Sequence, residues 1–209
     1  MTLAKFTGIV TPVLTPFNDD GSIAEDLYFE HCKHVLEEGS DYISPFGTSG
    51  EALSISMAER RYLLEKIIAH NIVRPDQIMP GTGLCSLGDT LDLTKHAVEL
   101  GCAAVMILPP FFFPSPGNNG LFRYFSDLIE TVGSDDLKIC LYHIPQNTGV
   151  GISPELTQQL NEAFPQAVVA YKDSSGNWDN TQSVIKSAPG VSVFPASEVL
   201  IPDATDLGA

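Results

Sequence analysis

One lysine stands where a nucleophilic amine is expected. Lys172 directly follows the apolar run 168–171, whereas most other basic residues lie on helical stretches or loops, and Lys138 begins an apolar run. Partial desolvation at the end of a strand favours the neutral amine, which can attack a carbonyl carbon. The alternative is an ion pair between Lys172 and Asp173 or another carboxylate. Position alone leaves both interpretations open.

A second candidate is the turn 47–51, which reads Gly-Thr-Ser-Gly-Glu and follows another apolar run. Two glycines permit a tight turn, and the hydroxyls of Thr48 and Ser49 with nearby backbone N–H groups can cradle an anion. A carboxylate or a phosphate would fit, although an ordinary glycine-rich turn has the same composition. The turn is not a P-loop, because no Gly-Lys-Ser/Thr follows it.

A third candidate is Tyr142, which ends the run 138–142 and precedes His143. A phenol at a strand end can relay protons, but a core tyrosine with a hydrogen-bonded hydroxyl gives the same pattern. His31 and His34 share one helical face without a third ligand in the sequence, so we expect no metal site there.

Seven short apolar runs must position these residues. They recur about every 25–35 residues, the length of a βα unit, and their continuous apolar character suits parallel strands buried on both faces. They are residues 8–13, 42–46, 77–81, 103–108, 138–142, 168–171 and 191–194. Strict alternation with helical segments predicts an α/β fold and favours a (β/α)8 barrel over a doubly wound open sheet. Both architectures bind ligands at the carboxyl ends of the strands.

Helix-start patterns separate the runs. Capping boxes are predicted at residues 22–25 and 56–59, and Ser153 followed by Pro154 predicts another N-terminus. Further helices are expected from Asp89 or Thr90 to Gly101, and over residues 121–132 and 177–187.

Composition narrows the class of protein. The chain of 209 residues is 44% hydrophobic and 18% charged, which predicts one globular domain over residues 1–209. With 26 acidic and 11 basic residues the net charge is −15, so nucleic acid and anionic membranes are not expected partners. The cysteines form no C-x-x-C pair and are expected to be small buried residues; they are Cys32, Cys85, Cys102 and Cys140. No signal peptide or membrane span is apparent, so a cytoplasmic location is expected.

The three candidate segments, in this order and spacing, resemble the dihydrodipicolinate synthase / N-acetylneuraminate lyase family of pyruvate-dependent class I aldolases. The opening residues 8–17 are similar to that family's first strand. The resemblance implies a (β/α)8 barrel, usually a homotetramer, that needs no metal or organic cofactor. It implies that Lys172 forms an imine with pyruvate or a similar 2-oxo acid, and that Tyr142 shuttles protons and is linked to Thr48. It also implies a substrate-binding set, which comprises Gly47, Thr48, Ser49, Asn147 and Ser174.

Four departures from the family pattern shape the expected reaction. Asn147 stands where synthases have an arginine that grips the second substrate's carboxylate, and Phe112 stands where a neighbouring subunit usually supplies a tyrosine. His143 replaces an asparagine, and no eighth strand or C-terminal helices follow residue 206, which predicts a truncated barrel with open edges. We therefore expect a lyase acting on pyruvate or a 2-keto-3-deoxy sugar acid, by aldol cleavage or dehydration. The alternatives are dihydrodipicolinate synthase proper, a non-catalytic 2-oxo-acid-binding relative, and a doubly wound phosphate-binding protein.

Overall fold

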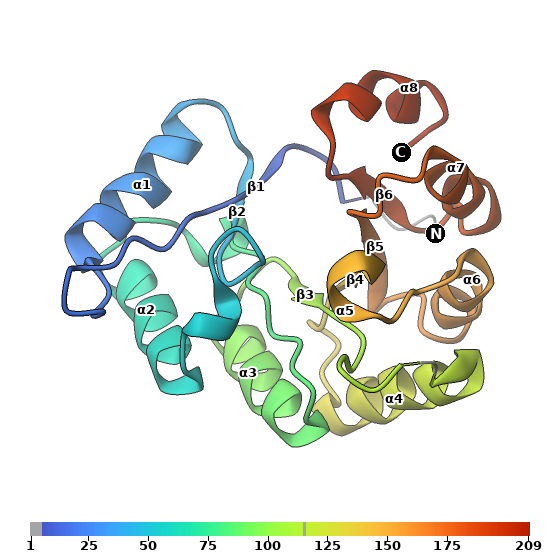
Figure 1. Cartoon of the computed structure of the whole chain (residues 1–209), viewed down its shortest axis with the longest axis horizontal. Helices are drawn as coiled ribbons and strands as arrows, with labels where there is room; N and C mark the ends of the chain where they lie inside the picture. The colour runs from blue at the N-terminus through green and yellow to red at the C-terminus, as the bar shows by residue number, and fades with distance from the viewer. Residues whose placement is uncertain (1–5, 115) are drawn as a thin grey trace. The chain divides into compact units, whose positions relative to one another are not determined.

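The computed structural model describes residues 6–114 and 116–209, and Figure 1 shows strands alternating with helices along the chain. The strands are β1 (Val10–Pro12), β2 (Tyr42–Ser44), β3 (Val105–Ile107), β4 (Ile139–His143), β5 (Val168–Asp173) and β6 (Ser192–Pro195). The helices are α1 (Glu25–Glu37), α2 (Met57–Ala69), α3 (Leu87–Glu99), α4 (Gly117–Val132), α5 (Pro145–Thr148), α6 (Pro154–Ala163), α7 (Trp178–Ser187) and α8 (Ile201–Asp206). The strand pairs β1–β2, β4–β5 and β5–β6 are parallel, which confirms the predicted α/β class.

The chain forms two compact units. One unit contains residues 8–82 and 92–106, and the other contains residues 6–7, 83–91 and 107–209. Both α3 and β3 cross the sequence boundary between the units. The prediction of a single domain over residues 1–209 stays a prediction.

In the unit with residues 8–82, β1 pairs with β2 in the register Val10↔Tyr42 to Pro12↔Ser44. The expected strand 77–81 is not continuous, and only single bridges form, Ile43↔Ile78 and Gly81↔Met106. The segment is still extended, since the N–H of Met79 donates to the carbonyl of Ile43 at 2.9 Å. Pro80 has no N–H to donate, so the ladder cannot be continuous there. The prediction of a full strand was therefore wrong, although the segment lies where a strand was expected.

In the other unit, β5 lies between β4 and β6. All five residues of β4 are buried, as expected for a parallel strand that is covered on both faces. Helices α6 and α7 pack against each other, with α6 also contacting β5 and α7 contacting β6 (Figure 1). This helix layer covers one face of the β4–β5–β6 part of the four-stranded sheet β3-β4-β5-β6 and leaves the other face to Tyr142 and Lys172.

The N-terminal caps of the helices agree in part with those predicted from the sequence. Ser56 and Glu59 form the predicted capping box, and Ser153 accepts a hydrogen bond from the N–H of Leu156 at 3.2 Å. The capping box predicted at residues 22–25 was wrong, because α1 follows Ala24 without a side-chain cap. The Ser22 hydroxyl instead donates to Asp20 at 2.6 Å within the preceding turn. Local turn formation therefore competed with capping for this serine.

Two further helix starts differ from the prediction, and two cysteines are less buried than expected. α3 begins at Leu87 and α4 at Gly117, both earlier than expected, and neither α5 nor α8 was predicted. Cys32 and Cys140 are buried as predicted, whereas Cys102 is only partly buried and Cys85 is exposed, which corrects the expectation for these two. Among the described residues, no helix is both long and apolar enough to cross a membrane.

The capping box of α2 gives a stability prediction. The Ser56 hydroxyl accepts from the N–H of Glu59 at 3.2 Å and donates to its carboxylate at 2.6 Å. Ser56→Ala is expected to lower the free energy of unfolding by about 1 kcal/mol at neutral pH. These hydrogen bonds hold the pKa of Glu59 below its ordinary value of 4.5, so the carboxylate's part of the stabilisation is present above that pH and is lost as the pH falls.

The measurement is urea denaturation of the unmodified protein and of Ser56→Ala at neutral and acidic pH. The difference in unfolding free energy between these two proteins should become smaller as the solution is acidified. Ser54→Ala is the matched control, because Ser54 is exposed and its hydroxyl makes no hydrogen bond within the described part of the chain. An equal loss of stability in both variants would contradict a capping role for Ser56.

Candidate active site

The structure brings Tyr142 and Lys172 together. The two residues are opposite each other in the β4–β5 register, and the Lys172 Nζ lies 4.6 Å from the centroid of the Tyr142 ring. Tyr142 is 3% exposed and Lys172 is half-buried. An ammonium over a phenol ring face is an attractive arrangement, and it fixes the otherwise flexible lysine stem. Two residues predicted separately from their strand-end positions therefore form one pair.

The alternation of side chains along β5 explains why Lys172 faces Tyr142. Successive residues of a strand point to opposite faces of the sheet. Tyr171 points to the helix layer, where its hydroxyl donates to the carbonyl of Ile152 at 2.9 Å, and Asp173 accepts from Thr181 of α7 at 2.8 Å. Lys172 lies between them in sequence and therefore faces away from the helices.

The alternative pairing of Lys172 with Asp173 is not formed. The Asp173 carboxylate bonds to Ser175, Asn180 and Thr181, and the ion pairs of the described residues do not include Lys172. The amine is thus held by an aromatic ring instead of by a carboxylate.

A second potential nucleophile shares this face of the sheet. Cys140 is two residues before Tyr142 and is opposite Ala170 in the register. Burial raises the pKa of its thiol to about 12, although the nearby Lys172 opposes this shift. A thiol with so high a pKa carries almost no thiolate at neutral pH, and the thiolate is the reactive form. Cys140 is therefore a poor nucleophile on this face.

Asn147 and Ser174 lie just beyond the two strands. Asn147 is exposed on α5, which directly follows β4, and its N–H donates to the carbonyl of Ile144 at 3.1 Å. The N–H of Ser174 donates to the carbonyl of His143 at 2.8 Å, and its carbonyl accepts from Gln146 at 2.6 Å. These bonds tie the chain beyond β4 to the chain beyond β5, and so place both residues near the end of the sheet that carries the Tyr142–Lys172 pair.

The turn 47–51 belongs to the unit with residues 8–82. Phe46 and Glu51 on either side adopt positive φ values of 60° and 52°, so the chain reverses sharply. A Cβ added to Gly50 would lie 2.7 Å from the carbonyl oxygen of Val13, which explains the glycine. Thr48 and Ser49 are exposed between the buried Gly47 and Gly50. The turn therefore presents two hydroxyls from a fixed backbone.

Sequence reasoning missed Arg60, which it treated as one more basic residue on a helix. Arg60 is only 3% exposed, and its guanidinium donates to the carbonyl of Ala52 just after the turn. Burial lowers its pKa, and its Nε has no hydrogen-bond partner in the described structure. Burying a guanidinium costs free energy, and hydrogen bonds to neighbouring groups offset that cost. We therefore interpret Arg60 as a residue that stabilises the turn 47–51 through its bond to the Ala52 carbonyl. No sequence pattern distinguished it from Arg61.

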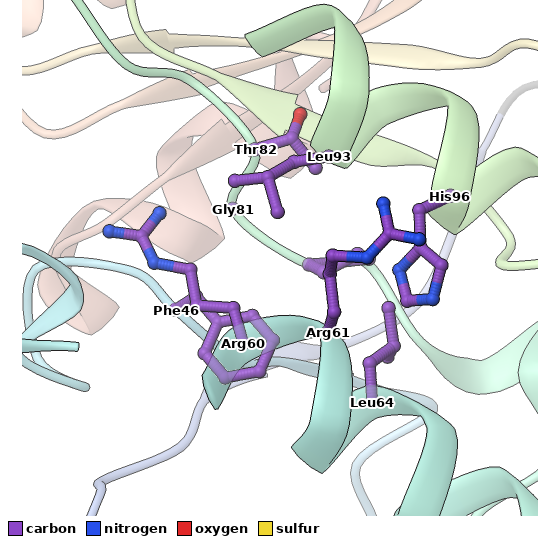
Figure 2. A pocket seen from close by; sticks show the side chains of 9 residues that line it. Phe46, Arg60, Arg61, Leu64, Gly81, Thr82, Leu93 and His96 are labelled. Carbon is purple, nitrogen blue, oxygen red and sulfur yellow. The ribbon is translucent and has the colours of Figure 1, made fainter. Parts of the chain in front are cut away.

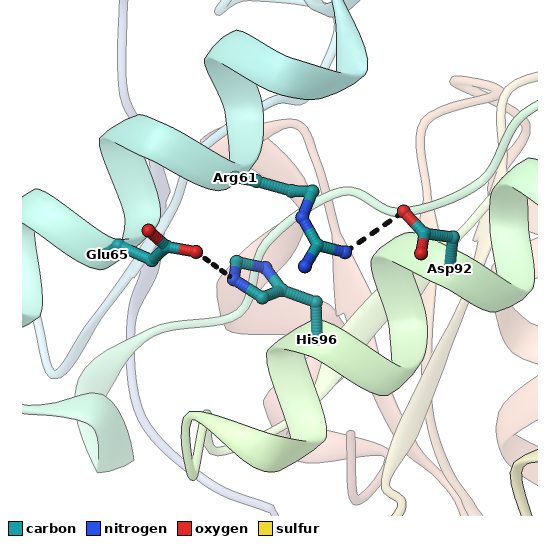
Figure 3. A network of polar contacts seen from close by, with 4 residues as sticks. All are labelled: Arg61, Glu65, Asp92 and His96. Atoms are coloured by element: carbon teal, nitrogen blue, oxygen red, sulfur yellow. Dashed lines mark hydrogen bonds and ion pairs between the residues drawn. The ribbon is translucent and has the colours of Figure 1, made fainter.

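A small cavity lies beside Arg60, between α2 and α3 (Figure 2). Its volume of about 10 Å³ has room for about one water molecule, and none of the predicted site residues lines it. The same helices are joined by two polar bridges, Arg61–Asp92 at 3.0 Å and Glu65–His96 at 2.8 Å (Figure 3). We assign these contacts to the packing of α2 on α3.

His143, His31 and Phe112 lie away from the Tyr142–Lys172 pair or at exposed positions. The His143 ring is 7% exposed, stacks on Tyr171 with ring centroids 5.6 Å apart, and accepts from the N–H of Ile152 at its Nδ1. Burial lowers its pKa, so His143 is a neutral residue on the helix side of the sheet. His31 accepts from the N–H of Leu14 at 3.1 Å. Phe112 is 79% exposed with φ of 80°, so it is not a packed core residue.

Comparisons with known proteins agree with this architecture. The model of the dihydrodipicolinate synthetase family matches residues 5–209. An uncharacterized DapA-like lyase of Chloroflexus aurantiacus is 34% identical over 208 residues, which is 99% of this chain and 69% of the relative. The chain spans 55–69% of the length of the curated relatives that it matches.

Two solved structures are similar throughout this chain. Dihydrodipicolinate synthase from Agrobacterium tumefaciens is 32% identical with a TM-score of 0.93, covering 97% of this chain and 70% of that one. YagE from Escherichia coli K12, a prophage protein of the same family in complex with pyruvate, is 25% identical with a TM-score of 0.89, covering 99% and 68%. The fold is that of the family's (β/α)8-barrel enzymes. The chain belongs to the dihydrodipicolinate synthetase family.

The support of the turn by Arg60 can be tested. Arg60→Met keeps the length of the side chain but removes the bond to the Ala52 carbonyl. We expect amide hydrogen exchange at Glu51, Ala52 and Ser54 to accelerate about tenfold, since a hydrogen bond from a charged donor contributes about 1.5–3 kcal/mol. Arg61→Met is the matched control, because Arg61 pairs with Asp92 instead. Equal exchange rates at these amides in both variants would contradict the assignment.

Proposed function

We propose that this protein is a class I lyase or aldolase in which Lys172 forms an imine with pyruvate or a 2-keto-3-deoxy sugar acid. The single observation that carries this proposal is the position of the Lys172 amine, 4.6 Å from the centroid of the buried Tyr142 ring on the neighbouring strand. Membership of the dihydrodipicolinate synthetase family supports it, as does the pyruvate complex of a structural relative.

The chemistry follows from an amine beside a phenol. The neutral Lys172 amine adds to the C2 carbonyl of the 2-oxo acid, and loss of water together with uptake of one proton gives an iminium ion. When the C3–C4 bond of an aldol substrate breaks, its electron pair moves into this iminium and forms an enamine, while the C4 hydroxyl loses its proton and becomes an aldehyde. Protonation of the enamine at C3 and hydrolysis then release pyruvate and the free lysine. Tyr142 is the proposed carrier of these protons.

The substrate carboxylate needs its own binding group. We propose that Thr48 and Ser49 hold it through their hydroxyls and through backbone N–H groups of the turn that begins at Gly47. Their exposure and the fixed backbone around them suit this role. Asn147 and Ser174 are proposed to contact the more distant part of the substrate.

Asn147 and Phe112 support the choice of substrate. A neutral amide cannot form the bidentate, charged clamp that an arginine gives to a second carboxylate. Phe112 has no hydroxyl with which to relay a proton. Both residues therefore favour a sugar acid over a two-carboxylate reaction partner.

Dihydrodipicolinate synthase proper is the second candidate, because the Agrobacterium structural relative carries that name. A non-catalytic 2-oxo-acid-binding relative is a third candidate, motivated by Phe112. A homotetramer in the cytoplasm is proposed on the family resemblance.

The imine can be trapped. Incubation with pyruvate and borohydride is expected to add to Lys172 the mass of pyruvic acid less one oxygen atom, because reduction makes the linkage permanent. Peptide mass spectrometry identifies the modified residue. Lys172→Met should abolish the adduct, whereas Lys186→Met, an exposed lysine on α7, should leave it unchanged. Absence of an adduct with pyruvate and with other 2-oxo acids would refute the proposed function.

The substrate choice gives a separate prediction. Pyruvate release from a panel of 2-keto-3-deoxy sugar acids should exceed the condensation of pyruvate with an amino-aldehyde acid, compared as kcat/KM. Asn147→Arg should shift the ratio by at least about tenfold toward the two-carboxylate reaction, because a charged hydrogen bond contributes about 1.5–3 kcal/mol. Asn147→Gln is the matched control, since it lengthens the side chain without adding charge. Faster condensation by the unmodified protein would support the synthase, and pyruvate adduct formation without any turnover would support the binding protein.

A further inference from the structure

A buried polar cluster lies on the helix side of the sheet, directly behind the Tyr142–Lys172 pair. Its centre is Asp173, which is 4% exposed. One carboxylate oxygen accepts from the N–H of Ser175 at 2.9 Å and from its hydroxyl at 2.6 Å. The other oxygen accepts from the Asn180 amide and from the Thr181 hydroxyl, both at 2.8 Å. We call these four residues the Asp173 cluster.

The cluster joins the end of β5 to the first turn of α7. Asn180 and Thr181 are on α7, whose N-terminus is capped by Asn177. A carboxylate near a helix N-terminus is stabilised by the helix dipole, and four hydrogen bonds offset the cost of its burial. A buried carboxylate that lost these hydrogen bonds would destabilise the folded protein. The four residues are therefore confined to positions that keep the hydrogen bonds formed.

Asn180 fixes the residues on both sides of Lys172. Its side-chain amide donates to the Tyr171 hydroxyl at 3.2 Å as well as to Asp173. The backbone of Asp173 is held on its other side, where its carbonyl accepts from the N–H of Ala196 at 2.8 Å. The peptide units around Lys172 are therefore anchored from the helix side and from the neighbouring strand, which leaves the lysine little freedom in the direction of its Cα–Cβ bond.

We infer that Asp173, Asn180 and Thr181 are positioning residues that hold the Lys172 amine over the Tyr142 ring. This inference rests on the proposed function, because it assigns the cluster a part in imine formation. The cluster acts through the backbone of β5 and does not touch the substrate side of the sheet. A nucleophile displaced by about 1 Å from its productive position reacts up to about a hundredfold more slowly, so an anchor of this kind controls the rate of attack.

The test uses a pair of substitutions at Thr181, which is 1% exposed. Thr181→Val keeps the shape but removes the hydroxyl from Asp173, and Thr181→Ser keeps the hydroxyl. At saturating pyruvate, the rate of borohydride trapping at Lys172 should fall about tenfold in the valine variant, with the half-saturating pyruvate concentration unchanged within about twofold. The serine variant should recover most of the rate. Asp179→Asn is the charge control, because Asp179 is exposed on the same turn of α7.

A second measurement does not depend on imine formation. Limited acetylation without substrate, read by peptide mass spectrometry with the exposed Lys186 as internal reference, reports how freely the Lys172 amine moves. Acetylation of Lys172 should be several-fold faster in Thr181→Val than in the unmodified protein and in Thr181→Ser. If the valine variant does not melt cooperatively, Asn180→Ala replaces it, because it removes both amide bonds.

The outcomes separate the two proposals. If the unmodified protein forms no adduct, the proposed function fails, and the acetylation rates alone decide whether the cluster positions Lys172. If the adduct forms and both trapping and acetylation are the same in Thr181→Val as in the unmodified protein, the positioning role is overturned. Slower trapping with restored rates in Thr181→Ser supports it, whereas an equal loss in the valine and serine variants indicates packing alone and overturns it.

Discussion

The register of β4 against β5 is the constraint on which the proposed site depends. Because side chains alternate along a strand, this one alignment sets Tyr142 opposite Lys172 on one face and His143 opposite Asp173 on the other. A shift by one residue would move the lysine to the helix side and bring the carboxylate to the site. The same register thus separates an amine held by an aromatic ring from a carboxylate that would otherwise neutralise it.

Asp173 and His143, which lie next to this alignment, make local hydrogen bonds, and these bonds account for their burial. Asp173 takes four hydrogen bonds from its own loop and from α7, and His143 accepts from the backbone of Ile152 while stacking on Tyr171. In the other unit, Arg60 gives a guanidinium bond to the backbone that follows the turn 47–51. Burying any of these groups without a hydrogen-bond partner would cost free energy. Each group therefore favours the one chain conformation that supplies its partner, and each lies beside a proposed site residue.

Two of the departures from the family pattern, Asn147 and Phe112, lie at exposed positions, whereas His143 is buried on β4. Asn147 is exposed on α5 and Phe112 is exposed on its loop, whereas Tyr142 and Lys172 lie on the buried sheet. Chemistry built on strands and recognition built on loops can change separately, since loops tolerate substitution without loss of the core. Membership of the dihydrodipicolinate synthetase family is therefore compatible with the proposed roles of Lys172 and Tyr142 and with the proposed difference in reaction partner.

The sequence by itself determined the α/β class, the strand ends that carry Lys172 and Tyr142, and the capping of α2 and α6, because these depend on residue order within a few positions. It did not predict the interrupted segment at Pro80, the failed cap at Ser22 or the exposure of Cys85, since backbone donors, competing turn bonds and neighbouring segments decide them. Only the tertiary structure decided which partner holds Lys172. Both Asp173 and Tyr142 were available in sequence, and the pairing of β4 with β5 selected the ring. The supporting roles of Arg60 and Thr181 likewise arise from contacts between elements, which local patterns do not encode.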